Sequence, residues 1–226
     1  MNFEAAREIM VDSQIRPNDV SDPEFVHAFL NTPREAFVPA TRKPVAYSEL
    51  EIETSEGRAL WTPRDTAKLL KAAAIKPTDI VLVIGAGAGY ETALISHLAE
   101  TVIALEDSAE LVDAMSDRFA SLGFDRAVAV EGKLEDGLAD QGPFDVIYVC
   151  GMVETVPQAW KTSSLKAAVW RLCSSSRIVW AVDASIRKRV RLYRRAMRSM
   201  LSRRNLRSST AKRHLFSDFP GWLRQR

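Results

Sequence analysis

The sequence predicts an α/β fold with a doubly wound, Rossmann-like parallel sheet that carries helices on both faces. From about residue 80 onward, short apolar runs rich in β-branched residues alternate with segments of helical periodicity, as expected for strands and their crossover helices. One of these runs, residues 80–84, leads through three alternating glycines directly into a helix. With 226 residues, 46% of them hydrophobic, the chain can bury the core of one large domain.

Proline marks the first turn of two expected helices. Pro23 and Pro63 each precede a run with helical spacing of apolar residues, and proline fits a first turn because the amide it lacks would have no partner there. In chain order the expected elements are helices 3–15 and 22–31, an extended passage over 47–57, a helix from Thr62-Pro63 to Lys76, strand 80–84, helix 89–99, strand 101–105, helix 109–121, strands 127–130 and 144–150, and a helix from Pro157.

Several classes of protein are not expected. The N-terminus has an early acid and no apolar signal core, and no apolar run is long enough to span a bilayer, so a cytoplasmic protein without membrane contact is expected. Two cysteines, Cys150 and Cys173, and three separate histidines form neither a disulfide framework nor a metal-ligand pattern. We therefore expect no metal site. We also expect the protein to be a monomer.

The glycine-rich turn predicts a nucleotide site. Gly85, Gly87 and Gly89 separate a strand from a helix, which brings backbone amides and the positive end of the helix dipole to the carboxyl edge of the sheet. Their spacing is tighter than the G-x-G-x-x-G of dinucleotide sites and suits S-adenosylmethionine, which has no phosphates. Glu106, at the end of strand 101–105, can accept hydrogen bonds from both ribose hydroxyls. Two alternatives stay open: an NAD site, and a turn that only lets a helix pack closely on a strand.

Three blocks of sequence resemble the protein-L-isoaspartate O-methyltransferase family. They are MVDSQIRPND at 10–19 with PREAFVP at 33–39, the cofactor region at 79–107, and GPFDVIY at 142–148. Within the third block, Asp145 matches the fourth-strand motif of class I methyltransferases and is expected to contact the cofactor; the alternative is an acid at the sheet edge that caps a turn. The resemblance implies a class I methyltransferase fold. It also implies methyl transfer from S-adenosylmethionine to the α-carboxylate of isoaspartyl residues in damaged proteins, which starts their repair.

The segment expected to place the substrate departs from the family pattern. The resemblance implies a segment like Gly-Gln-Thr-Ile-Ser-Gln-Pro, whose hydroxyls face the substrate, whereas here Gly57 is followed by RALWTP. The family hydroxyls therefore fall on Ala59 and Trp61, which have no hydroxyl to donate. A nearby guanidinium could hold the substrate carboxylate with two hydrogen bonds, and hydroxyls lie on both sides of Gly57 in the sequence. The candidates to replace the family hydroxyls are Arg58, Thr54, Ser55 and Thr62. Alternatively, Arg58 and Trp61 only cover the pocket, and the chain uses another acceptor or is inactive.

Charge divides the chain at about residue 160. Residues 1–160 have 13 Lys/Arg and 27 Asp/Glu, and residues 161–226 have 18 and 2. We expect residues 1–160 to form the methyltransferase domain, with the helical and substrate part in 1–60 and the cofactor-binding core in 61–160. The basic tail allows nucleic-acid binding as an alternative function, although no base-handling motif accompanies it.

A shift of reading frame near residues 158–160 also accounts for the tail. If the codons of residues 159–173 are regrouped from the third base of Ala159, permitted codon choices give LEDQLLKGGRLAVV, which resembles the helix, glycine turn and strand that the family has here. The last strands of the sheet would then be missing, and the exposed edge would make the protein unstable or prone to aggregate.

The nucleotide sequence of codons 155–180, read from independently prepared DNA, tests this hypothesis. We expect an inserted or missing base close to codon 159, because only a change of frame links the two readings. An intact frame would contradict the hypothesis and make the basic tail a genuine feature of the protein.

Overall fold

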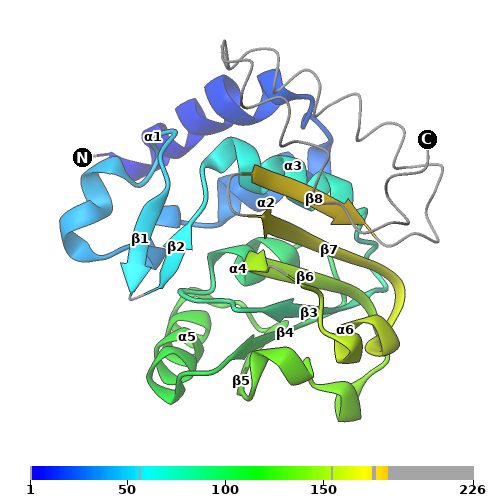
Figure 1. Ribbon diagram of the computed structural model, residues 1–226. Coiled ribbons are helices and arrows are strands. Elements are labelled where there is room, and N and C mark those ends of the chain that lie inside the picture. Colours follow the sequence, from blue (N-terminus) through cyan, green and yellow to red (C-terminus); the bar gives the residue numbers. More distant parts are fainter. Residues whose placement is uncertain (1, 56, 154, 175–176, 183–226) are drawn as a thin grey trace. The chain divides into compact units, whose positions relative to one another are not determined.

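The computed structural model describes residues 2–55, 57–153, 155–174 and 177–182. Helix α1 spans Phe3–Met10 and α2 spans Pro23–Asn31 (Figure 1). The expected helix over 3–15 changes its winding after Met10 and continues as a π-helical turn, Val11–Ile15, and a 3-10 turn, Arg16–Asn18. Pro17 contributes to this change because it has no amide hydrogen for an α-helical bond. Two further 3-10 segments follow, Arg34–Phe37 and Ala40–Val45.

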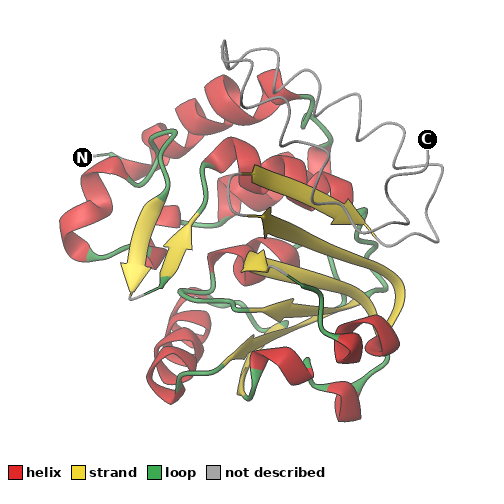
Figure 2. Ribbon diagram, viewed as in Figure 1, coloured by secondary structure: helices red, strands yellow, loops and turns green. Residues whose placement is uncertain are grey.

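A six-stranded sheet confirms the predicted doubly wound architecture (Figure 2). Its spatial order is β5-β4-β3-β6-β7-β8, and neighbouring strands are parallel except β8, which runs antiparallel to β7. Because the chain moves outward from β3 in one direction and from β6 in the other, the strand order reverses between β3 and β6, where such sheets bind ligands. The strands are β3 Ile80–Ile84, β4 Thr101–Glu106, β5 Ala127–Glu131, β6 Phe144–Val153, β7 Ser164–Ser174 and β8 Arg177–Val182.

Helices α3 (Pro63–Ala73), α4 (Tyr90–Ser96), α5 (Ala109–Leu122) and α6 (Gln158–Ser163) accompany this sheet. Alternate residues of β3 belong to two separate cores. Val81 and Val83 pack in a core that includes side chains of α3, α4 and α5, whereas Leu82 and Ile84 pack in a second core with Trp160 of α6. Burial on both faces explains why β3 reads as an unbroken apolar run. Within the described ranges, no helix is both long and apolar enough to cross a bilayer.

A two-stranded hairpin occupies the passage expected to be extended. Strand β1, Ile52–Ser55, pairs antiparallel with β2, Arg58–Leu60. The facing residues Ile52 and Leu60 are 3% and 2% exposed, so they attach the hairpin to the core while its other side chains remain available for contacts at the sheet edge.

The expectation that the last strands are missing is wrong for the described residues. Residues 164–174 and 177–182 form β7 and β8, which continue the sheet beyond β6. Trp160 is 3% exposed, and its indole Nε1 donates to the carbonyl of Leu134 at 2.8 Å. A Cβ on Gly137 would lie 2.5 Å from the Trp160 ring, so the neighbouring chain is shaped around this side chain. Strands β7 and β8 therefore cover the edge of β6 that the hypothesis expected to be exposed.

We predict that Trp160→Ala lowers the free energy of unfolding by about 3–5 kcal/mol, the usual cost of removing a buried Trp. Ile9→Ala is the matched control, because Ile9 is 65% exposed. Urea unfolding gives the free energy of unfolding of both variants, and the slope of this free energy against urea concentration should stay the same as in the wild type. Equal effects of the two substitutions would contradict the packing of α6 against the sheet.

Candidate active site

The glycine turn between β3 and α4 is held by the end of β4. The amide of Gly87 donates to Oε2 of Glu106 at 2.8 Å, and the amide of Gly85 donates to the carbonyl of Leu105 at 3.0 Å. Gly87 has a φ of +55°, and a Cβ there would lie 3.5 to 3.7 Å from side-chain atoms of Arg58. The turn therefore lies at the carboxyl edge of the sheet, directly beneath the Arg58 side chain.

Gly89 has a different role from the two preceding glycines. It precedes α4 with a φ of +90°, and a Cβ there would lie 2.9 Å from the ring of Phe119 and 3.0 Å from Met115, both on α5. Such contacts are too short for a real Cβ, so glycine at this position allows α4 and α5 to pack closely. The structure gives Gly89 a packing role, as one of the sequence alternatives proposed.

Glu106 ends β4 with a side chain that solvent does not reach. Its Oε1 accepts from the amide of Asp107 at 3.0 Å and from Arg58 Nη2 at 2.5 Å, while Oε2 accepts from the amide of Gly87 and, at 3.0 Å, from Arg58 Nε. Burial by itself raises the pKa of this carboxyl, but the hydrogen bonds from Arg58, Gly87 and Asp107 outweigh it and lower the pKa to about 2. The group is therefore ionised at neutral pH.

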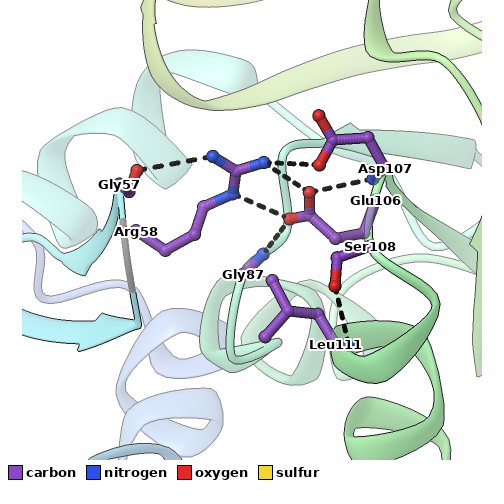
Figure 3. A network of polar contacts seen from close by, with 7 residues as sticks. All are labelled: Gly57, Arg58, Gly87, Glu106, Asp107, Ser108 and Leu111. Carbon is purple, nitrogen blue, oxygen red and sulfur yellow. Dashed lines mark hydrogen bonds and ion pairs between the residues drawn. The ribbon is translucent and has the colours of Figure 1, made fainter.

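Arg58 reaches Glu106 from the hairpin, 48 positions earlier in the chain. Figure 3 shows its guanidinium facing the Glu106 carboxylate, with Asp107 on the outer side; Arg58 Nη2 lies 2.9 Å from Asp107 Oδ1. The hydrogen bonds to Glu106 raise the pKa of Arg58 although the side chain is partly buried. Arg58 does bind a carboxylate with two hydrogen bonds, but in this structure the carboxylate belongs to the residue expected to hold the ribose.

A pocket of about 210 Å³ opens beside the glycine turn. Thr54 and Ser55 of β1 are among the residues that line it, and the Ser55 hydroxyl is buried with no hydrogen-bond partner among the described residues. The Thr54 hydroxyl lies 3.3 Å from the carbonyl of Arg58, to which it can donate. The lining residues are Phe37, Val38, Pro39, Thr54, Ser55, Gly87, Ala88, Leu111, Ala114 and Arg118.

Arg118 is a pocket residue that the sequence analysis did not single out. Its Nε donates to the carbonyl of Ala36 at 2.9 Å and its Nη1 to that of Ala88 at 2.7 Å. Burial lowers the pKa of this guanidinium, and the ion pairs formed by the described residues do not include it. Arg118 lies seven positions after Leu111 on α5, so the two share a helix face, and this spacing was the available signal.

Thr62 and Trp61 are placed in supporting roles. The Thr62 hydroxyl accepts from the amide of Asp65 at 3.1 Å and caps α3. Trp61 is 7% exposed, and its carbonyl accepts from Arg34, a fully buried cation that also donates to the carbonyl of Ala46 at 2.7 Å. Of the four candidates for the substrate site, the structure therefore brings Thr54 and Ser55 into the pocket, places Arg58 on Glu106, and uses Thr62 as a cap.

The assignment of Asp145 to the cofactor is corrected by its position. Asp145 lies near the start of β6, and its Oδ2 accepts from the amide of Ile80, the first residue of β3, at 3.0 Å. The glycine turn follows Ile84 at the other end of β3, about 13 Å away at the rise of a strand. Asp145 therefore joins two strands at the amino edge of the sheet and cannot contact a ligand at the carboxyl edge.

The residues at the carboxyl edge fit S-adenosylmethionine. Two N–H donors of Arg58 occupy both oxygens of Glu106, so the carboxylate presents its oxygens in the way that two adjacent ribose hydroxyls require. Gly87 has no side chain on the face of the turn that the Arg58 stem covers, where a Cβ would lie 3.5 to 3.7 Å from Arg58 atoms. Within the described part of the chain, no group of three His, Cys, Asp or Glu side chains could hold a metal ion.

We predict that Glu106→Gln lowers the free energy of unfolding near pH 7 by about 1–3 kcal/mol, because it removes the charge from a buried set of hydrogen bonds. The pKa of Glu106 in the folded chain lies below its ordinary value of 4.5. The stabilisation is therefore complete above about pH 4.5 and is lost as the pH falls toward about 2. Urea unfolding near pH 7, 5 and 3 should give a difference between the two proteins that is constant at first and then shrinks. A difference that did not change with pH would show that the charge of Glu106 does not stabilise the fold.

Comparisons with known proteins agree with this geometry. A family model described as protein-L-isoaspartate(D-aspartate) O-methyltransferase matches residues 5–205. The chain is 37% identical over 157 residues to a protein-L-isoaspartate O-methyltransferase of Koribacter versatilis, covering 70% of this chain and 71% of that protein. It is 34% identical over 179 residues to one of Roseiflexus castenholzii, covering 79% and 78%. The family model matches residues on both sides of residue 160, where the frame was expected to change. The nucleotide sequence has still to test the reading-frame hypothesis, which stays a prediction.

Two solved structures show the same fold. A protein-L-isoaspartate O-methyltransferase aligns with a TM-score of 0.69 at 24% identity, covering 78% of this chain and 59% of its own. A putative protein-L-isoaspartate O-methyltransferase from Plasmodium falciparum, in complex with S-adenosyl-L-homocysteine, aligns with a TM-score of 0.66 at 17% identity, covering 80% and 89%. Since the family model matches most of the chain, this chain belongs to the protein-L-isoaspartate O-methyltransferase family.

Proposed function

We propose that this chain is an S-adenosylmethionine-dependent carboxyl O-methyltransferase that methylates the α-carboxylate of isoaspartyl residues in damaged proteins. The observation that carries the proposal is the buried, ionised carboxylate of Glu106, hydrogen-bonded to the glycine turn at the carboxyl edge of the sheet, in a chain of this family. The methyl ester would then give way to a succinimide, from which a normal peptide bond can re-form.

The proposed cofactor contacts are the glycine turn and the acid that follows β4. Glu106 would accept hydrogen bonds from the ribose hydroxyls, and Gly85 and Gly87 would let the backbone approach the amino-acid part of the cofactor. Bound S-adenosylmethionine supplies a methyl group on a sulfonium, which is a good leaving group. Gly89 would act on the cofactor only indirectly, because it is the residue before α4 and sets the backbone conformation from which this helix starts.

The proposed reaction needs little acid–base catalysis by the protein. The acceptor is a carboxylate, which is already ionised at neutral pH, so its oxygen can form the new O–CH3 bond as the S–CH3 bond breaks, without any proton transfer. Positioning of the acceptor therefore supplies most of the catalysis. The presence of Thr54, Ser55 and Arg118 among the residues that line the pocket supports this role, while Ala59 and Trp61 offer no hydroxyl.

The proposal extends to the setting of the enzyme. Its partners would be isoaspartyl-containing proteins and peptides, and it would work as a monomer in the cytoplasm, where S-adenosylmethionine is available. Nucleic-acid binding by the basic tail would depend chiefly on residues 183–226, which lie outside the described residues, and no feature of the glycine-turn site favours it.

A methyl-transfer assay tests the proposal. We expect labelled methyl groups to pass from S-adenosylmethionine to an isoaspartyl peptide and not to the same peptide containing aspartate. Glu106→Ala should weaken binding of S-adenosylhomocysteine by about 1–3 kcal/mol, because the ribose loses its acceptor. Asp12→Ala, at a carboxylate that is 72% exposed, is the control and should bind like the wild type.

Two outcomes would contradict parts of the proposal separately. If the wild-type protein bound S-adenosylhomocysteine but did not methylate the isoaspartyl peptide, the chain would be a binding-only family member or use another acceptor. Unchanged affinity of Glu106→Ala would show that the cofactor site is elsewhere.

A further inference from the structure

Arg58 occupies the hydrogen-bonding sites that the proposed cofactor needs. Glu106 receives two donors from Arg58 and two from backbone amides, so each of its oxygens already has two partners. The ribose hydroxyls cannot donate to the same oxygens while the guanidinium stays in place. The stem of Arg58 also lies over Gly87, within van der Waals distance of where a Cβ would be, so it covers the turn that the cofactor would approach.

We propose that Arg58 is a positioning residue with two alternating partners, Glu106 before the cofactor binds and the acceptor carboxylate afterwards. This inference rests on the proposed function. The cofactor would displace the guanidinium from Glu106, and only then would Arg58 be free to bind a substrate. The acceptor therefore binds more tightly once the cofactor is in place.

The hairpin places a displaced Arg58 next to the pocket. Arg58 faces Ser55 across the β1–β2 pair, and Thr54 and Ser55 both line the pocket. A rotation of the side chain, without movement of the hairpin backbone, would exchange one carboxylate partner for another on the same side of the glycine turn. Arg58 and the Ser55 hydroxyl, which has no partner among the described residues, would then converge on the acceptor.

The charge of the acceptor favours the exchange of partners before methyl transfer and its reversal afterwards. When the ribose takes over Glu106, Arg58 loses two charge-assisted hydrogen bonds and needs a new anion, which the acceptor carboxylate provides. Methylation converts that carboxylate into a neutral ester, so Arg58 loses its anionic partner once the O–CH3 bond has formed. Return of the guanidinium to Glu106 then favours release of the methyl ester and of S-adenosylhomocysteine.

The first test is the affinity of S-adenosylhomocysteine, measured by titration calorimetry on the full chain. Arg58→Gln, which introduces the residue that the family segment has at this position, should bind S-adenosylhomocysteine about tenfold more tightly than the wild type, because the competing state is removed. Arg16→Gln is the matched control, since Arg16 pairs with Asp12 in an exposed helical turn, and it should bind like the wild type. Equal or weaker binding by Arg58→Gln would overturn the proposal.

The second test is the coupling between the two ligands. The wild-type protein should bind an isoaspartyl peptide more tightly with saturating S-adenosylhomocysteine than without it, and by linkage the peptide should tighten S-adenosylhomocysteine by the same factor. In Arg58→Gln this coupling should disappear and KM for the peptide should rise more than kcat falls, while Arg58→Lys should keep part of the coupling.

The two tests separate this inference from the proposed function. If neither the wild type nor Arg58→Gln bound S-adenosylhomocysteine, the cofactor assignment itself would fail. If both bound it equally and the peptide showed no coupling in the wild type, the cofactor site would stand and the alternating role of Arg58 would be wrong.

Discussion

The carboxylate of Glu106 is the group on which the geometry of this site depends. A buried charge is costly unless it is fully hydrogen-bonded, and here the four donors come from three segments of the chain: the end of β4, the glycine turn and the hairpin. Because each segment supplies a donor, a shift of any one of them would leave part of the charge without a partner. The same bonds that keep Glu106 ionised therefore fix the distance between the glycine turn and the strand beside it.

Besides the buried side chains of Ile52 and Leu60, main-chain hydrogen bonds on either side of the hairpin attach it to the rest of the domain. Arg34 is fully buried and donates to the backbone carbonyls of Ala46 and Trp61 on either side of the hairpin, and its guanidinium lies 4.7 Å from the centre of the Tyr90 ring. Main-chain carbonyls are present whatever the side chain. The segment that departs from the family pattern can therefore change its side chains at the pocket without losing its position.

The sequence correctly predicted strands and helices where both the spacing of apolar residues and the residues that begin or end an element were clear. The run at 80–84 and the helices that begin at Pro23 and Pro63 were correctly placed, because burial on both faces and the first-turn preference of proline are local properties. The hairpin at residues 52–60 and the strands β7 and β8 were missed. The strands of the hairpin have only four and three residues, which is too short for a clear alternation, and the basic composition of residues 161–226 suggested a tail.

The site was predictable only in part, for a related reason. Gly87 and Glu106 follow from the order strand, turn, helix, strand, which fixes their place at the carboxyl edge. Asp145 was misplaced because the resemblance to a family motif was given more weight than its position at the start of the predicted strand 144–150, which lies at the opposite edge of a parallel sheet. The contact between Arg58 and Glu106 could not be read from the sequence, because it depends on how the hairpin approaches the glycine turn. For Arg118 the sequence offered only its spacing from Leu111, which places the two on one helix face but does not say that this face lines a pocket.

The exchange of hydroxyls for a guanidinium changes what the substrate site can recognise. A hydroxyl donates one hydrogen bond, which is stronger to a carboxylate than to its neutral methyl ester, whereas a guanidinium offers the carboxylate two parallel bonds between opposite charges and loses that charge pairing with the ester. A site built on Arg58 would therefore distinguish acceptor from product more strongly than a site built on hydroxyls. The same cation would bind tightly to any other carboxylate within reach, and the nearest is Glu106. The pairing of Arg58 with Glu106 is then the direct consequence of placing a guanidinium beside a buried carboxylate.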